Sequence, residues 1–551
     1  MMNIDTITEQ FPFSERTPVR MLQRRMHDDA IFATQAGDGR TFTCADVAVL
    51  AARVCHFLQG LGMRPGARVA WMAPSSIESI ALWLGISAIG AVDICVGEAL
   101  KGALLEQVLN DSEPEILLVD QRVGEGIAEL PPEVLSPLRH VVSVGPVETA
   151  PAGRMAFDVH AAREAEREVF NPIVQAPNEL TTIVYTSGTT GPSKGVMICH
   201  HHLFFVGAGF AEKFRIEPDS VLYHYSPYNH ITGRQLITAA LATGARMVLR
   251  EHFSLNSFWN DINHFGCTHA ITLGSAVPLL LDRTGEEAVN QGSLMYVWAS
   301  PAMPKPYAAF ERRFGVRVAV PFGSTETGIV TLPSLDDPSA PPGNSGRRCD
   351  QFAVDIFDEN DQVCRPGVTG EIVVRPQVGW TTLLGYLNRP ATTIETTRNL
   401  WYHTGDYGRM DENGYLFFVD RKQDFIRVKG ENVSSSEVEQ VLVLHPDVAD
   451  CAVVAVASEL GDEEIMVCVV PSAGAQFNPA HLFRWAAQHL PYYMVPRFVQ
   501  LIDDLPRSHS GKIEKYKLRA TGITEAAWDA KAAGLRASRR GVVETGGVGP
   551  A

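Results

Sequence analysis

The strongest chemical signal in the sequence is a run of hydroxyl side chains, glycines and one lysine. It reads TSGTTGPSKG at residues 186–195, directly after the apolar segment 182–185. Glycine lets the backbone approach a ligand closely, and N–H groups, hydroxyls and a lysine suit phosphate oxygens. Because Lys194 is followed by Gly195, the run differs from a Walker A loop, which ends in G-K-S/T. It predicts a phosphate-binding loop of another type, the alternative being a flexible surface loop.

A second run, FGSTETG at residues 322–328, combines an acid with a hydroxyl and an aromatic ring. Glu326 is a hard oxygen ligand of the kind that Mg²⁺ prefers. Thr325 is able to donate to a phosphate oxygen, and Phe322 offers a flat face to an adenine ring. The run therefore predicts a metal–nucleotide site, with a solvated loop acid as the alternative for Glu326.

A third run, YHTGD at residues 402–406, ends in a carboxylate. Asp406 can accept hydrogen bonds from both hydroxyls of a ribose, and Gly405 allows the backbone to turn tightly. The run predicts the sugar side of a nucleotide site, with a turn aspartate as the alternative.

The elements that must position these residues follow an alternating pattern. Short β-rich runs alternate with helical patterns, which predicts parallel sheets covered by helices and an α/β fold class. Residues 1–20 are expected to form an arm. The expected helices are 77–89 and 104–109, and the expected strands are 70–73, 91–96, 116–119, 181–185, 247–249, 270–273, 294–298 and 316–320.

The pattern changes after residue 350. The runs FAVDIFD and GEIVVRP, within 351–380, predict an antiparallel hairpin region, and another strand is expected at 415–419. The charged segment 420–424 then separates a smaller α+β block from the large first block. The smaller block should hold helices at 436–444 and 482–489 and strands at 452–457 and 465–470. Beyond residue 519 the chain is rich in Ala, Gly and Arg and is expected to be a frayed tail.

Composition excludes several classes of protein. The 551 residues are 45% hydrophobic and 20% charged, which excludes a chain that is disordered throughout. The net charge of −16 argues against nucleic acid or an anionic membrane as the main partner. The nine cysteines include no C-x-x-C pair and are expected to be reduced thiols. The N-terminus has no secretory pattern and the apolar run 80–92 is too short to span a bilayer, so we expect a cytoplasmic protein.

Five motifs, in order along the chain, resemble those of the adenylate-forming superfamily, which includes acyl- and aryl-CoA synthetases, luciferases and peptide-synthetase adenylation domains. They are TSGTTGPSKG, FGSTETG, YHTGD, the block 420–439 and the segment 506–512, and FTCAD at 42–46 resembles the family's opening. The run VKGENVSSSEVE at 428–439 is more similar to acyl-CoA ligases of the crotonobetaine/carnitine type than to peptide-synthetase domains. Ser435 stands where many relatives have proline.

The resemblance implies the adenylate-forming enzyme fold. Residues 1–419 would form an N-terminal AMP-binding domain of two α/β subdomains and a β-barrel-like subdomain. Residues 420–424 would be a hinge and 425–520 a mobile C-terminal α+β domain, followed by a disordered tail over 521–551. Gln423 matches the hinge position, where the family usually has Asp or Lys.

The resemblance also implies a two-step ligase reaction with ATP, Mg²⁺ and coenzyme A. A carboxylic acid would be activated as acyl-AMP with release of pyrophosphate, and CoA would then take the acyl group. The alternatives are an enzyme that loads a carrier protein or stops at acyl-AMP, and an ATP-binding pseudoenzyme. The intact Thr325, Glu326, Asp406 and Lys512 argue against the pseudoenzyme. The expected partner is a small carboxylic acid, without nucleic acid or stable membrane insertion; the acid's identity and the oligomeric state, a homodimer included, stay open.

Site residues are carried over motif by motif. Lys512 would be the mobile catalytic lysine, Glu326 and Thr186 metal ligands with a catalytic role, and His230 a wall of the acyl pocket, a core histidine being the alternative. Arg421 would be a second ribose contact or a solvated linker arginine. The implied cofactor-binding residues are Thr186, Ser187, Gly188, Thr189, Thr190, Gly191, Lys194, Ser300, Phe322, Gly323, Ser324, Thr325, Asp406, Arg421, Lys429 and Gly430.

Three further residue groups have two interpretations each. Trp298 would either shorten the acyl pocket or fill core. Arg234 would meet a second polar group of the substrate or, more in line with its type, form a surface salt bridge. The run Cys199–His202 suggests zinc, but adjacent residues of one element cannot all face one ion, so no metal site is predicted there.

Overall fold

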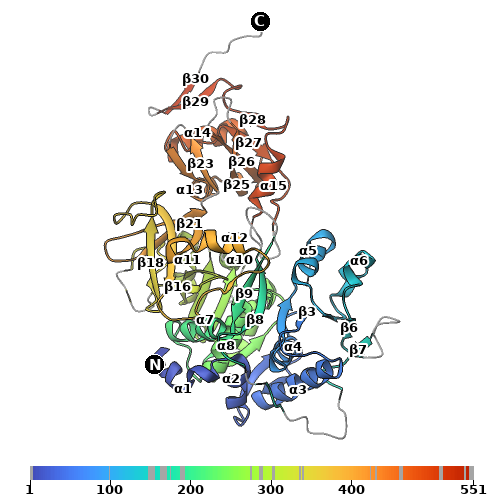
Figure 1. Ribbon diagram of the computed structural model, residues 1–551. Coiled ribbons are helices and arrows are strands. Elements are labelled where there is room, and N and C mark those ends of the chain that lie inside the picture. Colours follow the sequence, from blue (N-terminus) through green and yellow to red (C-terminus); the bar gives the residue numbers. More distant parts are fainter. Residues whose placement is uncertain are drawn as a thin grey trace.

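The computed structural model shows a large α/β body and a smaller C-terminal part, which lies at the top of Figure 1. It describes residues 4–98, 100–146, 155–161, 170–173, 175–186, 193–273, 276–283, 290–300, 304–333, 337, 340–421, 424–428, 431–457, 463–507, 513–538 and 541–544. Among these residues, no helix is both long and apolar enough to cross a membrane. All nine cysteines are free thiols.

The first sheet of the body has the strand order β20-β9-β8-β4-β3-β5-β6-β7. The strands from β8 to β7 are parallel, whereas β9 and β20 are antiparallel. Every residue of β4 and β5 is buried, as expected for a parallel sheet covered on both faces. Its strands are β3 (Arg68–Met72), β4 (Val92–Cys95), β5 (Ile116–Asp120), β6 (His140–Val144), β7 (Met155–Phe157), β8 (Leu180–Thr186), β9 (Lys194–Cys199) and β20 (Gly385–Tyr386). The connecting helices are α3 (Cys44–Gly60), α4 (Ile77–Ala88), α5 (Gly102–Ser112), η2 (Gly124–Ile127) and α6 (Pro132–Leu135).

The second sheet has the order β14-β13-β12-β10-β11-β1-β2 and is parallel except for the β1–β2 hairpin. Its strands are β1 (Ile31–Gln35), β2 (Thr41–Thr43), β10 (Val221–His224), β11 (Arg246–Leu249), β12 (His269–Leu273), β13 (Tyr296–Ser300) and β14 (Arg317–Ala319). The accompanying helices are α9 (Leu255–Phe265), α10 (Ala276–Arg283) and α11 (Pro304–Phe314). The alternation of strand and helix predicted for the large block is confirmed in both sheets.

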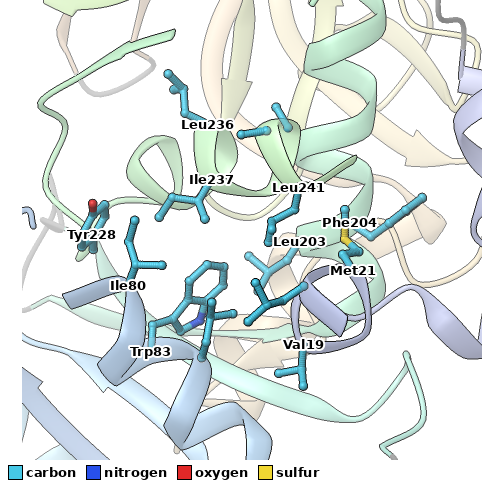
Figure 2. Close-up of a cluster of buried hydrophobic side chains, with 14 of the residues drawn as sticks. Val19, Met21, Ile80, Trp83, Leu203, Phe204, Tyr228, Leu236, Ile237 and Leu241 are labelled. Carbon is cyan, nitrogen blue, oxygen red and sulfur yellow. The ribbon is translucent and has the colours of Figure 1, made fainter. Parts of the chain in front are cut away.

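Helices α7 (His200–Lys213) and α8 (Ile231–Thr243) are buried along most of their length. They pack with α4 and with α2 (Pro18–Arg25) in the main hydrophobic core. Figure 2 labels the side chains that meet there: Val19, Met21, Ile80, Trp83, Leu203, Phe204, Tyr228, Leu236, Ile237 and Leu241. This core holds the segment between β10 and α8, which carries His230.

The prediction of an arm at the N-terminus is wrong for residues 4–20. Helix α1 (Ile4–Gln10) and the short helix η1 (Phe13–Glu15) precede α2, and Ile7 and Phe11 are buried in the main core. Thr17 caps α2 by accepting a hydrogen bond from the backbone N–H of Arg20. The helices are too short to show a clear apolar period in the sequence, so packing against the body decides their structure.

An antiparallel β-rich region completes the body. A small sheet holds β15 (Phe322–Ser324), β16 (Gly328–Leu332) and β17 (Arg347–Arg348), and a larger one has the order β18-β19-β21-β22. The predicted hairpin region is confirmed, because β18 (Phe352–Phe357) pairs antiparallel with β19 (Gly370–Pro376). Helix α12 (Pro390–Thr396) and η4 (Arg398–Leu400) precede β21 (Tyr402–Met410), which pairs with β22 (Leu416–Arg421).

The C-terminal part has its own hydrophobic core, from Ile426 to Leu535. Its central sheet has the order β25-β26-β27-β28. Its elements are β23 (Phe425–Val428), β24 (Glu431–Ser434), α13 (Ser435–Leu442), β25 (Val448–Ala457), β26 (Glu463–Pro471), α14 (Pro479–His489), β27 (Phe498–Leu501), α15 (Lys515–Thr521), β28 (Trp528–Asp529), β29 (Leu535–Ser538) and β30 (Gly541–Glu544). The expected frayed tail beyond residue 519 is therefore wrong for residues 520–538 and 541–544, since Ala530 and Leu535 are buried in this core and Gly541–Glu544 form β30.

Candidate active site

Glu326 lies at the centre of the candidate site, in the turn between β15 and β16. Its side chain is buried, and its Oε1 accepts a hydrogen bond from the Tyr386 hydroxyl at 2.8 Å. The Tyr386 hydroxyl is in turn 3.1 Å from that of Tyr402. Burial, together with the charge of Glu326, raises the pKa of both tyrosines above the usual range, so both remain protonated donors. The Tyr386 hydroxyl, itself in contact with that of Tyr402, orients this carboxylate.

The strand hairpin that flanks the phosphate-loop motif reaches the same cluster. Thr186 ends β8 and stands opposite Lys194, the first residue of β9. The Nζ atom of Lys194 lies 5.4 Å from the centre of the Tyr386 ring, within range of a cation–π interaction. Thr186 and Lys194 are therefore brought to the side of the Glu326–Tyr386 pair, as a shared nucleotide site requires.

The backbone of the FGSTETG run is shaped by a close turn. A Cβ atom on Gly323 would lie 2.2 Å from the carbonyl oxygen of Gly328, so only glycine fits there. The Ser324 hydroxyl accepts a hydrogen bond from the backbone N–H of Glu326, which orders the turn. Phe322 is 7% exposed and stacks on Phe418 of β22 at 6.2 Å. Most of the ring that was expected to face adenine is thus in contact with protein.

The predicted sugar-binding pair lies on the β21–β22 hairpin. The register places Asp406 opposite Arg421, and Arg421 Nε is 3.8 Å from Asp406 Oδ1. Gly405 has a φ of 71°, which favours glycine, and its N–H donates to Glu371 Oε1. Tyr402, which contacts Tyr386, begins the same strand β21. One strand therefore connects the Glu326 cluster with the Asp406–Arg421 pair.

His230 immediately precedes α8 and is partly exposed, which excludes the alternative of a fully buried core histidine. Its backbone N–H donates to the Pro227 carbonyl, and its own carbonyl accepts from the N–H of Gly233. Trp298 packs against Phe210 of α7 and against Phe214, which directly follows that helix, with ring centres 5.4 and 6.4 Å away. Its position agrees with the core-filling interpretation.

Arg234 differs from its prediction. It forms the expected salt bridge, with Asp93, but the pair is in the interior and neither side chain is more than 1% exposed. Arg234 and Asp93 are 141 positions apart in the chain, so no local sequence pattern indicates that they pair in the interior.

The donor set of the site fits Mg²⁺. This ion takes oxygen ligands and is usually bound by one or two carboxylates together with substrate phosphates and water. Glu326 and Thr186 offer a carboxylate and a hydroxyl of that kind. Within the described part of the chain, no three His, Cys, Asp or Glu side chains gather into a self-sufficient metal site. The histidines of α7 are buried, which lowers the pKa of His200 to about 3 and that of His202 to about 4.

Several predicted site residues lie outside the described residues: Ser187, Gly188, Thr189, Thr190, Gly191, Gln423, Lys429, Gly430 and Lys512. Ser300 is the last residue of β13, where it pairs with Leu273. Sequence reasoning missed Tyr386 and gave Tyr402 no role. Their contacts join segments up to 60 positions apart, so no local pattern predicts them. The only local signal for Tyr386 is the G-Y dipeptide shortly before Pro390.

Comparisons with known proteins show which family the chain is similar to. The family model described as AMP-binding enzyme matches residues 20–387, and that of the AMP-binding enzyme C-terminal domain matches residues 437–512. A crotonobetaine/carnitine–CoA ligase of Salmonella arizonae is 28% identical over 492 residues, covering 89% of this chain and 95% of the relative.

Two solved structures extend the comparison. ATP-bound MatB from Rhodopseudomonas palustris has a TM-score of 0.81 and 26% identity over 92% of this chain and 99% of that one. The amide bond synthetase McbA from Marinactinospora thermotolerans has a TM-score of 0.78 and 27% identity, with the same coverage of 92% and 99%.

Proposed function

We propose that this chain, which belongs to the AMP-binding enzyme family, is an ATP-dependent acyl-CoA ligase acting on a small carboxylic acid. The observation that carries the proposal is the continuous arrangement of Lys194, Tyr386 and Glu326 beside the Asp406–Arg421 pair. In this proposal Lys194 contacts phosphate, Glu326 the metal and the Asp406–Arg421 pair the ribose.

In the first step, a carboxylate oxygen of the acid attacks the α-phosphorus of ATP. The bond from that phosphorus to the bridging oxygen breaks, and pyrophosphate leaves, which gives acyl-AMP. Lys194 and the Thr325 hydroxyl donate to phosphate oxygens as their charge grows. Glu326 and Thr186 would hold Mg²⁺, which would neutralise part of this charge. Tyr386 keeps the Glu326 carboxylate oriented.

In the second step, the CoA thiol loses its proton, its sulfur attacks the acyl carbonyl carbon, and AMP leaves as the thioester forms. Lys429 and Gly430 are assigned to CoA. Lys512 is assigned to the first step, which requires the C-terminal part to turn about residues 420–424 between steps. His230 forms a wall of the pocket for the acid.

CoA is favoured as the acceptor by the likeness to the crotonobetaine/carnitine–CoA ligase over nearly its whole length. The alternative, an enzyme that forms acyl-AMP and passes the acyl group elsewhere, keeps some support from the likeness to an amide bond synthetase.

The decisive experiment measures pyrophosphate release from ATP with a panel of small carboxylic acids, with and without CoA, and identifies products by mass spectrometry. We expect at least one acid to give acyl-CoA and AMP in equal amounts. Acyl-AMP that is trapped by hydroxylamine but never converted by CoA would favour the alternative acceptor. ATP binding without pyrophosphate release from any acid would favour a pseudoenzyme.

A further inference from the structure

Arg234 is among the largest side chains that are fully buried in the described residues. It stands on the first turn of α8 and makes a two-pronged ion pair with Asp93 of β4, with Nη1–Oδ1 and Nη2–Oδ2 distances of 2.7 and 2.5 Å. Nη1 also donates to the Thr182 hydroxyl of β8 at 2.7 Å. Trp71 donates to the same Asp93 carboxylate. The guanidinium therefore ties α8 to two central strands of the first sheet.

The Nε donor of Arg234 reaches the loop that carries His230. Its Nε donates to the carbonyl oxygen of Tyr228 at 2.9 Å, two residues before His230. The same loop is held by the Ser75 hydroxyl, which donates to the Ser226 carbonyl at 3.1 Å. Gly233 of α8 packs directly against this loop. A Cβ atom at Gly233 would lie only 2.4 Å from the Pro227 carbonyl oxygen, so a larger residue would push the loop away. Loop 226–230 is thus clamped between the sheet and the start of α8.

A buried charge at this place needs a reason other than stability. Burial by itself lowers the pKa of Arg234, but the Asp93 carboxylate outweighs burial and the pKa is raised, so the guanidinium stays charged. Well-packed apolar residues of similar size often stabilise a core as much as such a pair or more. An apolar pair has no N–H group to donate to a loop carbonyl. Arg234 donates to the Tyr228 carbonyl, and Asp93 holds the guanidinium in place.

We propose that Arg234 is a positioning residue for the acid pocket: braced by Asp93, it fixes the Tyr228 carbonyl and so sets the place of His230 at the pocket wall. The proposal rests on the proposed function, in which His230 lines that pocket. Acid selectivity then depends on a residue that touches no substrate.

The test compares two double variants in pyrophosphate-release kinetics. Asp93→Leu/Arg234→Met removes both buried charges together, so no unpaired charge is left in the core. Arg250→Met/Asp261→Leu is the matched control, since these residues form another two-pronged pair, with Nη2–Oδ1 at 2.8 Å, between the residue that directly follows β11 and helix α9. We expect the first variant to raise the acid KM about tenfold and to change the preference between a short and a longer acid, with the ATP KM within about twofold. The control variant should change neither preference nor acid KM.

Arg234→Lys is the second variant, in case the double substitution prevents folding. A lysine can pair with Asp93, but it lacks the fork that reaches Tyr228 at the same time. We expect it to fold and to show the same direction of change in acid KM. Hydrogen exchange by mass spectrometry should show faster exchange in the peptide covering residues 226–233 in both Arg234 variants, and not in the control.

The outcomes separate this proposal from the proposed function. If His230→Ala raises the acid KM while the Arg234 variants behave as wild type, the positioning role is wrong and the pocket assignment stands. If no acid supports turnover in wild type, the proposed function fails, and the exchange measurement still decides whether Arg234 orders loop 226–230. Unchanged exchange in both Arg234 variants overturns the proposal in either case.

Discussion

Two arginine–aspartate pairs in this protein have the same chemistry and opposite settings. Arg234 and Asp93 are at most 1% exposed and contact each other through two short hydrogen bonds, whereas Arg421 and Asp406 are 34% and 19% exposed and 3.8 Å apart. Both members of the buried pair also form hydrogen bonds to other protein groups: Arg234 to Thr182 and Tyr228, and Asp93 to Trp71. A long contact at a partly exposed position is easily exchanged for a ligand hydroxyl. The difference agrees with the proposal that the exposed pair binds ribose, whereas the buried pair only contacts other parts of the protein.

The largest expected effect tests the buried side of this comparison. Asp93→Ala leaves the Arg234 guanidinium buried without its carboxylate, which should lower the free energy of unfolding by about 3–5 kcal/mol. Asp406→Ala should lower it by less than about 1 kcal/mol. Denaturant unfolding of both variants beside wild type measures the contrast, and equal losses would abolish the distinction between the pairs.

Lys512→Ala, in the C-terminal part, should change the rate of adenylation without changing the stability of the fold. Removal of one transition-state donor should slow pyrophosphate release by roughly 10²–10³-fold, with the unfolding midpoint unchanged. Thioester formation from supplied acyl-AMP should be largely retained. Lys517→Ala is the control, because Lys517 is an exposed lysine on the adjoining helix α15. Pyrophosphate release at the wild-type rate would show that Lys512 is not the catalytic lysine.

Glu326→Gln extends the same test to the body. The amide keeps the shape but loses the charge that holds a hard cation, so adenylation should fall by about 10²-fold and need more Mg²⁺. Tyr386→Phe, which removes only the hydroxyl that orients Glu326, should have a smaller effect in the same direction. A Mg²⁺ titration at saturating ATP measures the adenylation rate and the Mg²⁺ requirement of each variant. An unchanged metal requirement in Glu326→Gln would exclude the ligand role.

Asp406→Ala sharpens the exposed side of the comparison. Loss of charge-assisted hydrogen bonds to a ribose should cost about 2 kcal/mol, which is roughly a 30-fold rise in the ATP KM. The acid KM should stay as in wild type. Steady-state kinetics with each substrate varied in turn would contradict the ribose role if the ATP KM did not change.

A third pair, Glu439 and Lys515 at 2.8 Å in the C-terminal part, predicts a pH effect. Burial raises the pKa of Glu439 to about 7, against the opposing influence of Lys515. Because the folded pKa is the higher one, the stabilisation is complete below about pH 4.5, the unfolded value, and is lost as the pH rises towards 7. Relative to Glu439→Gln, the unfolding free energy of wild type should fall over this range by at most about 1.4 kcal/mol per pH unit. Parallel pH profiles of unfolding would refute the assignment.

The parts of the fold that follow local patterns were predictable. The strand before the phosphate loop and the β18–β19 hairpin lie where apolar runs and turn residues indicate. Motifs likewise indicate Glu326 and Asp406 as candidate site residues, because each has a recognisable set of neighbouring residue types. The expected strand over 294–298 is shifted by two residues, to Tyr296–Ser300, as strand ends depend on the partners β12 and β14.

What the sequence could not predict depends on contacts between distant positions. The burial of Arg234, the Tyr386 contact to Glu326 and the packing of α1 each join segments far apart in the chain. The residues next to a charged side chain in the sequence do not indicate that its partner lies on a distant strand.

The short strand β28 has a consequence for the limits of the C-terminal part. Trp528 and Asp529 pair with Val499 and Phe498, so they cover the outer edge of β27. The C-terminal family model stops at residue 512, well before this strand. A chain cut near residue 520 would leave unpaired those backbone N–H and C=O groups of β27 that face β28. Such an uncovered edge is a template for a strand from another molecule, so the last segment protects the protein against aggregation.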